Sequence, residues 1–258
     1  MFGAVAGDIV GSIYERSGMK STKFPLFKKK SSFTDDTILT MATAHAIMNE
    51  VDYGTAYKSF ALNYPDRGYG GMFNQWAKSL ELQPSYNSFG NGSAMRVGPI
   101  GFAFDRLEDV LEQARLSAIC THSHEEAIRG AQTVAAAIWY ARHKKNRNEI
   151  RTLIAEMSGY NLSRTIEEIR PDYKFNVTCQ GSVPEAIIAF LDSTTFEEAI
   201  RLAISLGGDS DTIACIAGEI AEAYYKTLPK KIIKSVWKKL PIPFRHILYD
   251  FYRYLNVI

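Results

Sequence analysis

The chain has 258 residues, of which 46% are hydrophobic and 22% charged, and its formal net charge is +2. These values are ordinary for a globular protein and exclude an intrinsically disordered chain. This length can bury a substantial core, in one large domain or two small ones, and the near-neutral charge provides no general electrostatic reason to expect a nucleic acid partner.

Helical periodicity, with apolar residues three and four positions apart, dominates the sequence from its first residues. Gly3, Gly7 and Gly11 recur every four residues and share one face of a first expected helix, where they permit tight packing against another core helix. That glycine pattern does not match a dinucleotide-binding motif, which also needs a preceding strand. Further helices are expected over 36–50, 107–122, 125–143, 149–160, 196–206 and 211–226.

Two alanine-rich segments, 131–141 and 212–221, are apolar on most sides, so we expect them at the centre of the globule. Strand-like alternation is nearly absent, and the short segment 173–180 is the one plausible strand. We detect no internal repeat and no Pro- or Ser-rich linker. The pattern therefore predicts an all-α fold in one domain, residues 1–258.

The cysteines and the first residues indicate a reducing compartment. The three cysteines, Cys120, Cys179 and Cys215, cannot all pair within the chain. Residues 1–15 are apolar but lack the basic region of a secretory signal peptide. No run of about 18 apolar residues is present, so neither a membrane-spanning helix nor a membrane partner is expected. We therefore expect a cytoplasmic protein.

Basic residues gather in one short stretch, KSTKFPLFKKK, which runs from Lys20 to Lys30. A charge run of this kind is most often a solvated loop. The alternative is a contact with a ligand that carries phosphate. With the small net charge, the solvated loop is the favoured interpretation, and no stable complex with nucleic acid is expected.

Two acidic motifs stand at the beginnings of expected helices about 175 residues apart: Asp35 and Asp36 in SSFTDDTILT, and Asp209 and Asp211 in SLGGDSDTIA. One aspartate can cap a helix, but capping does not explain a second. Two carboxylates ~4 Å apart repel by about 4 kcal/mol at an effective dielectric of 20. Hard divalent cations supply the missing counter-charge. The alternative is that each motif caps its own helix and the pairs never meet.

Two glycine-rich loops, at 63–76 and 84–102, lie between the acidic motifs. Glycine-rich turns before a helix expose backbone N–H groups that suit phosphate oxygens. Phe89 is an aromatic residue in a polar loop, which suits stacking on a base. The alternative is that both loops are ordinary turns and that Phe89 only packs.

Cys120, His122 and His124 alternate in ICTHSHEEA. They offer three soft ligands for zinc, without a partner cluster at finger-like spacing. A cysteine–histidine nucleophile lacks a third, orienting group. Neither interpretation is favoured.

Taken together, the motifs GAVAGDIVGSIYE, FTDDT, DRGYGG, GNGSAMRVGPIG, THSH and LGGDSDT resemble the ADP-ribosylglycohydrolase family, which includes the dinitrogenase reductase-activating glycohydrolase and the ADP-ribosylarginine and ADP-ribosylserine hydrolases. The resemblance covers about residues 2–225 and preserves the motif order, whereas 226–258 carry no signature of it. It implies an all-α, compact orthogonal helical bundle with two Mg²⁺ or Mn²⁺ ions in a central cleft. It also implies cleavage of the bond between ADP-ribose and a modified group.

Carried over by motif, the resemblance implies metal ligands at Thr34, Asp35, Asp36, Asp209, Asp211 and Thr212. Glu15, at the end of the first helix, resembles an acidic residue on a flexible loop that closes over the metals. Asp66 resembles an aspartate near the substrate ribose, so the expected catalytic residues are Glu15, Asp36 and Asp66. The implied substrate-binding residues are Gly68, Tyr69, Gly70, Ser88, Phe89, Gly90, Asn91, Gly92 and His122.

The expected function is therefore metal-dependent hydrolysis that reverses ADP-ribosylation, with an ADP-ribosylated protein or small molecule as substrate and a monomer or weak oligomer as the working form. Two alternatives belong to other classes. One is a catalytically silent protein that binds ADP-ribose, and the other is a dinuclear metal phosphohydrolase. The DRGYGG and GNGSAMRV motifs look nearer to the serine-type hydrolases than to the arginine-type ones, and acceptor recognition is the least transferable property of a family.

Overall fold

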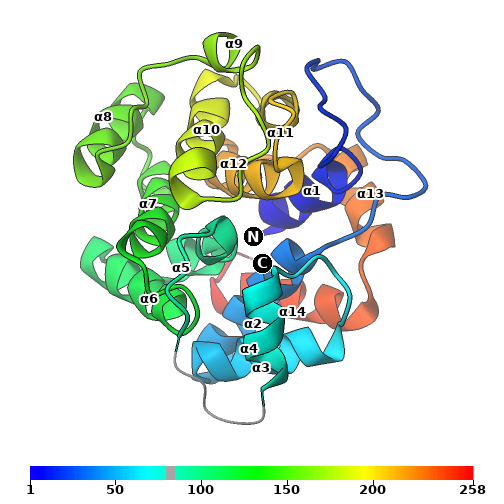
Figure 1. Cartoon of the computed structure of the whole chain (residues 1–258), viewed down its shortest axis with the longest axis vertical. Helices are drawn as coiled ribbons and strands as arrows, with labels where there is room; N and C mark the ends of the chain where they lie inside the picture. The colour runs from blue at the N-terminus through cyan, green and yellow to red at the C-terminus, as the bar shows by residue number, and fades with distance from the viewer. Residues whose placement is uncertain (80–84, 258) are drawn as a thin grey trace.

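The computed structural model describes residues 1–79 and 85–257, and leaves 80–84 and 258 undescribed. The described ranges contain α-helices and one 3₁₀ turn, and no β-strand (Figure 1). The elements are α1 (Phe2–Gly11), α2 (Asp35–Asn49), α3 (Tyr53–Asn63), α4 (Gly71–Lys78), η1 (Asn91–Ser93), α5 (Gly98–Ala103), α6 (Leu107–Ile119), α7 (Glu125–Arg142), α8 (Arg147–Ser158), α9 (Ile166–Ile169), α10 (Cys179–Asp192), α11 (Phe196–Ile204), α12 (Ser210–Tyr225), α13 (Lys230–Lys239) and α14 (Ile242–Tyr254).

The predicted all-α class is confirmed, and each helix expected from periodicity is present as α1, α2, α6, α7, α8, α11 or α12. The expected strand at 173–180 is wrong. Its backbone makes only one short pairing with the preceding glycine-rich loop, through Asn91 N–H to the Val177 carbonyl at 2.8 Å and Cys179 N–H to the Phe89 carbonyl at 2.9 Å. The pairing ends there because both segments turn directly into helices, η1 and α10.

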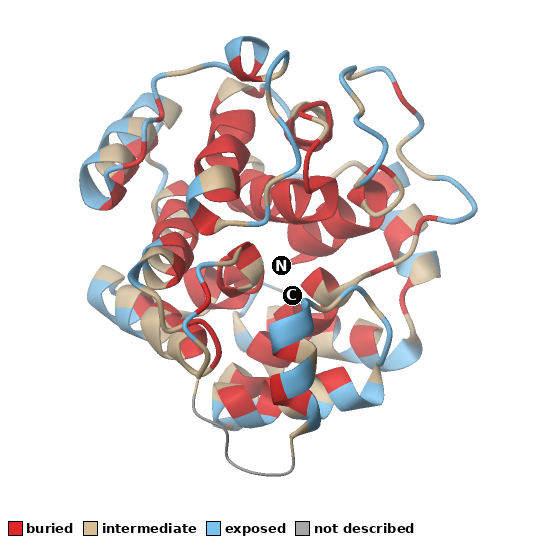
Figure 2. Cartoon of the chain, in the orientation of Figure 1, coloured by how far each residue is buried: buried red, intermediate tan, exposed pale blue. Residues whose placement is uncertain are grey.

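The centre of the bundle is the contact between α1 and α12, which lie side by side (Figure 1). A Cβ atom on Gly7 would lie 2.0 Å from the Ala214 carbonyl oxygen, and one on Gly3 would lie 2.1 Å from that of Gly218. Only hydrogen fits at such distances, so the four-residue glycine spacing serves close helix packing, as the sequence predicts. Figure 2 shows both helices buried along their length.

The last two helices complete the same core. Phe244 and Phe251 of α14 are fully buried. The Phe244 ring centroid lies 5.4 Å from that of Phe33 and 4.6 Å from that of Tyr64, next to α2 and α3. Among the described residues, no helix combines the length and the apolar character needed to cross a membrane.

Candidate active site

The first acidic motif begins α2. Thr34 is the N-cap residue, and its hydroxyl accepts a hydrogen bond from the Asp36 N–H. The Asp35 N–H instead donates to the Arg67 carbonyl at 2.8 Å, which ties this helix start to the first glycine-rich loop. Because Thr34 fills the capping role, neither aspartate side chain is needed as a cap.

The second acidic motif begins α12 and contacts the first directly. Asp209 occupies the N-cap position, yet in the described structure its side chain makes no capping bond; it accepts a hydrogen bond from the Asn91 amide at 2.7 Å. The Thr212 hydroxyl donates to Asp36 Oδ2 at 3.4 Å. The two motifs therefore meet, and the interpretation in which each only caps its own helix is wrong.

Glu15 joins this group from a turn, not from a helix. The expectation that it ends the first helix is wrong, because α1 stops at Gly11 and the Ser12 hydroxyl donates back to the Ile9 carbonyl. The chain then turns, and one carboxylate oxygen each of Glu15, Asp209 and Asp211 lie within 4.8 Å of one another. Three carboxylates at this separation form a candidate cation site.

The electrostatics of the cluster favour a bound cation. Burial, reinforced by neighbouring carboxylates, raises the pKa of Asp35 to about 8 and the pKa values of Asp36 and Asp211 well above their usual range. Burial also raises the pKa of Asp209 to about 6. Within the described part of the chain, the buried Asp36 Oδ1 has no hydrogen-bond partner. The residues therefore fit a hard divalent cation, which supplies the missing charge and takes oxygen ligands.

Asp8 is a residue that sequence reasoning missed. It is fully buried on α1, and its two oxygens accept bonds from the Thr34 N–H at 2.9 Å, the Thr34 hydroxyl at 2.8 Å, the Thr37 N–H at 3.1 Å and the Thr37 hydroxyl. Burial outweighs these donors and raises the pKa of Asp8 to about 6. Asp8 thereby orients the start of α2. The sequence feature that could have identified Asp8 is a single carboxylate within an apolar helix that carries glycine at every fourth position.

A cavity of about 360 Å³ adjoins the carboxylates, and most of the predicted site residues line it. Gly68 adopts φ +103°, and a Cβ atom there would lie 2.9 Å from Asp35 Oδ1, so glycine is required twice over. The predicted residues that line the cavity are Glu15, Thr34, Asp35, Asp36, Gly68, Gly70, Ser88, Gly90, Asn91, Gly92, His122, Asp209, Asp211 and Thr212.

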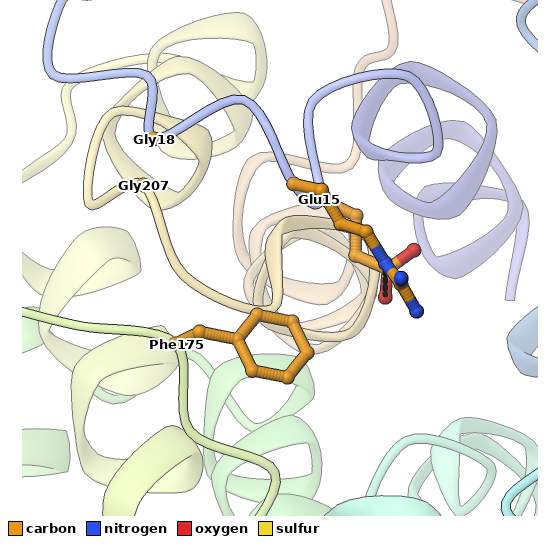
Figure 3. Close-up of a pocket in the computed structure, with 5 residues that line it drawn as sticks. Glu15, Gly18, Phe175 and Gly207 are labelled. Carbon is orange, nitrogen blue, oxygen red and sulfur yellow. Dashed lines mark ion pairs between the residues drawn. The ribbon is translucent and has the colours of Figure 1, made fainter.

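A second cavity, of about 490 Å³, adjoins the first on the Glu15 side and is lined by Glu15, Arg16, Gly18, Phe175 and Gly207 (Figure 3). Glu15, Arg16 and Phe175 belong to both. Figure 3 shows the Phe175 ring pointing across this space toward the side of Glu15. The Glu15 carboxylate pairs with the Arg16 guanidinium at 4.0 Å. Sequence reasoning missed Phe175 because the segment was read as a strand.

Three predicted site residues do not line either cavity. Asp66 is exposed, with φ +59°. The Tyr69 hydroxyl donates to the Tyr64 carbonyl, and its ring stacks on Phe73. Phe89 is 46% exposed, and its ring meets His124 edge-on with centroids 5.4 Å apart.

The THSH motif supports the cavity wall instead of forming a zinc site or a nucleophile. His124 caps α7 by accepting from the Glu126 N–H, and the Cys120 thiol donates to the Ser117 carbonyl. His122 Nδ1 lies 2.7 Å from the Thr121 hydroxyl, which also accepts from Arg96. Burial, and then the nearby Arg96 guanidinium, lower the pKa of His122 well below its usual value, so its ring is neutral.

Arg96 is a second residue that sequence reasoning missed. It is fully buried, lines the first cavity and lies over the Tyr57 ring, 4.0 Å from its centroid. It also donates to the Ser117 carbonyl at 2.7 Å. A buried guanidinium held in this way fixes the wall that carries His122.

Comparison with known proteins identifies the family, and the match extends beyond residues 2–225, so the expectation that the following residues carry no family signature is wrong up to residue 248. Residues 1–248 match the family model for ADP-ribosylglycohydrolase. ADP-ribosylhydrolase ARH3 of Mus musculus is 29% identical, over 86% of this chain and 82% of the mouse protein. ARH3 of Xenopus tropicalis is 27% identical, over 87% and 85%.

A solved structure described as an ADP-ribosylglycohydrolase-related protein complex superposes with a TM-score of 0.76 at 22% identity, over 99% of this chain and 95% of its own; at that identity the likeness speaks for the fold alone. The family match extends over nearly the whole chain. The chain therefore belongs to the ADP-ribosylglycohydrolase family and is a hydrolase.

Proposed function

We propose that this protein hydrolyses the glycosidic bond between ADP-ribose and an acceptor, and that two Mg²⁺ or Mn²⁺ ions assist. The observation that carries the proposal is the meeting of the two acidic motifs, with Thr212 donating to Asp36, at the edge of a cavity of about 360 Å³. The ARH3 relatives, named as ADP-ribosylhydrolases, support the choice of substrate.

The proposed metal ligands are the hydroxyl and carboxylate groups of the two helix starts: Thr34, Asp35, Asp36, Asp209, Asp211 and Thr212. Bound divalent cations supply positive charge that polarises substrate oxygens and lowers the pKa of coordinated water. Asp8 holds Thr34 in place from below, and Asn91 holds Asp209 by its 2.7 Å hydrogen bond. These contacts fix the ligand groups before substrate arrives, which lowers the entropic cost of reaction.

The proposed substrate-binding wall lines the same cavity as the carboxylates. Gly70 has open space around its Cα, which permits a diphosphate to approach the backbone closely. The neutral His122 ring lies under Gly92, whose ideal Cβ position is 3.2 Å from His122 Nε2, and this favours an uncharged contact. Ser88, Gly90 and Asn91 complete the wall. Tyr69 and Phe89 stand outside it and are proposed as rim residues.

Glu15 is the proposed acid or base at the scissile bond, because it lies where the two cavities join. Because Glu15 lines both cavities, its carboxylate can exchange a proton with an acceptor group in the second cavity while ADP-ribose occupies the first. Asp36 would act as a metal ligand, and its role toward the ribose would depend on the cation it holds. Asp66 lies two residues before Gly68, and its exposed side chain reaches the ribose only if this loop closes over the substrate.

The deciding experiment incubates the protein with arginine-linked and serine-linked ADP-ribosyl peptides in Mg²⁺, in Mn²⁺ and in EDTA. We expect the protein to release ADP-ribose from one of the two linkages in Mg²⁺ or Mn²⁺, and to release none in EDTA. Binding of ADP-ribose with no release from either peptide would favour a silent binding protein. Cleavage of p-nitrophenyl phosphate without release of ADP-ribose would favour a phosphohydrolase.

Compartment and assembly are part of the same proposal. The three cysteines are free, which agrees with work in a reducing cytoplasm. We propose a monomer or weak oligomer as the active form, to be checked by light scattering on the purified protein.

A further inference from the structure

Basic side chains are concentrated in two stretches of the chain. Residues 16–30 and 226–239 each contain six lysines or arginines and no acidic residue, so together they carry +12. The remainder of the chain has 18 basic and 28 acidic residues, a net of −10. The formal charge of +2 is therefore the sum of +12 in these two stretches and −10 in the remainder of the chain.

The two basic stretches lie side by side in the structure. The Lys239 ammonium, at the end of α13, donates to the carbonyls of Ser31 at 2.6 Å and Lys28 at 3.3 Å. Figure 1 shows the long loop between α1 and α2 passing α13, and Figure 2 shows the exposed stretches of both. We define the basic face as the exposed lysines Lys28, Lys29, Lys30, Lys230, Lys231, Lys234 and Lys238.

The lysines of the basic face have no acidic partners among the described residues: none of them is within 4.0 Å of a carboxylate oxygen there. Positive charge without a carboxylate partner, on a molecule whose remaining residues are net negative, favours a polyanionic partner over a neutral one.

Helix α13 also presents an aromatic side chain among these lysines. Its buried residues are Ile232 and Val236, while Trp237 is 38% exposed. Lys230, Lys234 and Lys238 recur every four residues, and Trp237 follows Lys234 by three, so all four share the solvent side of the helix. Lysines on phosphates together with an exposed ring on a base are the contacts that hold single-stranded nucleic acid.

We propose that the basic face binds single-stranded nucleic acid without sequence preference, with its lysines on successive phosphates and Trp237 stacked on a base. An acidic protein matches the charge, whereas a single strand matches both the charge, with its phosphates, and the indole, with its bases. The proposal replaces the expectation of no nucleic acid partner, which relied on the small net charge of the whole chain. It is independent of the hydrolase activity, since no residue of the cleft takes part.

The test measures fluorescence anisotropy of a labelled oligonucleotide of about 20 nucleotides, titrated with the full chain. If about five phosphates are neutralised, the affinity should fall about 100-fold between roughly 50 and 200 mM salt. The paired changes Lys29→Glu with Lys30→Glu, and Lys230→Glu with Lys234→Glu, should each weaken binding at least about 30-fold at the lower salt. Trp237→Ala should weaken it about tenfold.

The matched control is Lys144→Glu with Lys145→Glu, between α7 and α8, away from the basic face (Figure 1). It changes the formal charge from +2 to −2, as each test pair does, so it isolates position from total charge. Binding that survives only in the control supports the proposal. The corresponding Lys→Gln pairs, together with a thermal melt of each variant, distinguish lost binding from lost folding.

Three results would overturn the proposal. The first is an equal loss of affinity in the control, which would assign the binding to total charge. The second is tighter binding of a poly-glutamate peptide than of the oligonucleotide, with no effect of Trp237→Ala, which would assign the surface to an acidic protein. The third is no oligonucleotide binding at about 50 mM salt, where electrostatic contacts are strong.

Discussion

The acidic cleft and the basic face each gather side chains of the same charge, but the cleft buries them and the face exposes them to solvent. In the cleft, Asp36, Asp209 and Asp211 are buried together. On the face, the lysines are spread over exposed surface. A pair of unit charges ~4 Å apart repels by about 4 kcal/mol at a dielectric of 20 and by only about 1 kcal/mol in water. Burial therefore makes the acidic cluster fit a divalent cation, whereas the exposed lysines repel one another only weakly and point to a partner only together with Trp237.

Removing one buried carboxylate should have the largest effect. Asp211 lies in the first turn of α12, where it is not the capping residue. We expect Asp211→Asn to lower hydrolysis by more than about 100-fold, beyond the cost of losing an outer-shell partner. Without metal, the variant should unfold at the same temperature as the wild type or a higher one, because repulsion is relieved.

The measurements are turnover and thermal midpoint, each with Mg²⁺ and with EDTA. The exposed Asp250→Asn serves as the control. If the Asp211→Asn variant keeps both its activity and its metal-induced rise in thermal midpoint, Asp211 is not a metal ligand.

Asp8→Asn tests the support beneath the cleft. Asparagine has the same shape but presents N–H donors where one carboxylate oxygen accepts from Thr34 and Thr37. We expect the Mg²⁺ concentration that gives half the rise in thermal midpoint to increase about 10- to 100-fold. An unchanged concentration would make Asp8 purely a packing residue.

Gly7→Ala tests the helix contact that brings the acidic residues together. The new Cβ would lie 2.0 Å from the Ala214 carbonyl oxygen, so α1 and α12 must separate. We expect a loss of about 1–3 kcal/mol in the free energy of unfolding, measured in urea. The matched control is Gly71→Ala, whose Cβ meets no atom within 4 Å. An equal loss in both variants would contradict the role of this contact.

The pH dependence of the metal-free protein should follow the cleft. The folded-state pKa values of Asp209, about 6, and Asp35, about 8, exceed the usual unfolded value of about 3.9. The folded state therefore binds more protons, and its stability is full at low pH and lost as the pH rises through these values. In EDTA the thermal midpoint should fall from pH 5 to pH 9, and Mg²⁺ should flatten the curve. A rise across this range in EDTA would contradict the mechanism.

Phe89→Ala should have the smallest effect. The half-exposed ring keeps its edge against His124 and stands at the rim of the cavity, so we expect ADP-ribose binding to weaken by about 1 kcal/mol, the lower end of base stacking. Calorimetry with ADP-ribose provides the measurement. No change would mean that Phe89 only packs.

Much of the local structure could be predicted from the sequence. Periodicity located the helices, because the apolar face of a helix is set by residues three and four apart. The spacing of Gly3, Gly7 and Gly11 predicted close packing, since a missing Cβ has the same meaning in every context. The adjacent carboxylates at the starts of α2 and α12 predicted a cation site, because local capping uses only one of them.

Other features were decided only by the tertiary structure. Whether Asp36 meets Thr212 depends on how α1 holds α12 against α2, and no local pattern contains that contact. The contact of Phe89 with His124 and the position of Phe175 at the second cavity depend on residues distant in sequence. The exposure of Asp66 was likewise not predictable from its motif. The buried acidic cleft and the exposed basic face likewise form only when chain segments far apart in sequence are packed together. Local propensity acts through neighbours along the chain, whereas charge and cavity depend on neighbours in space.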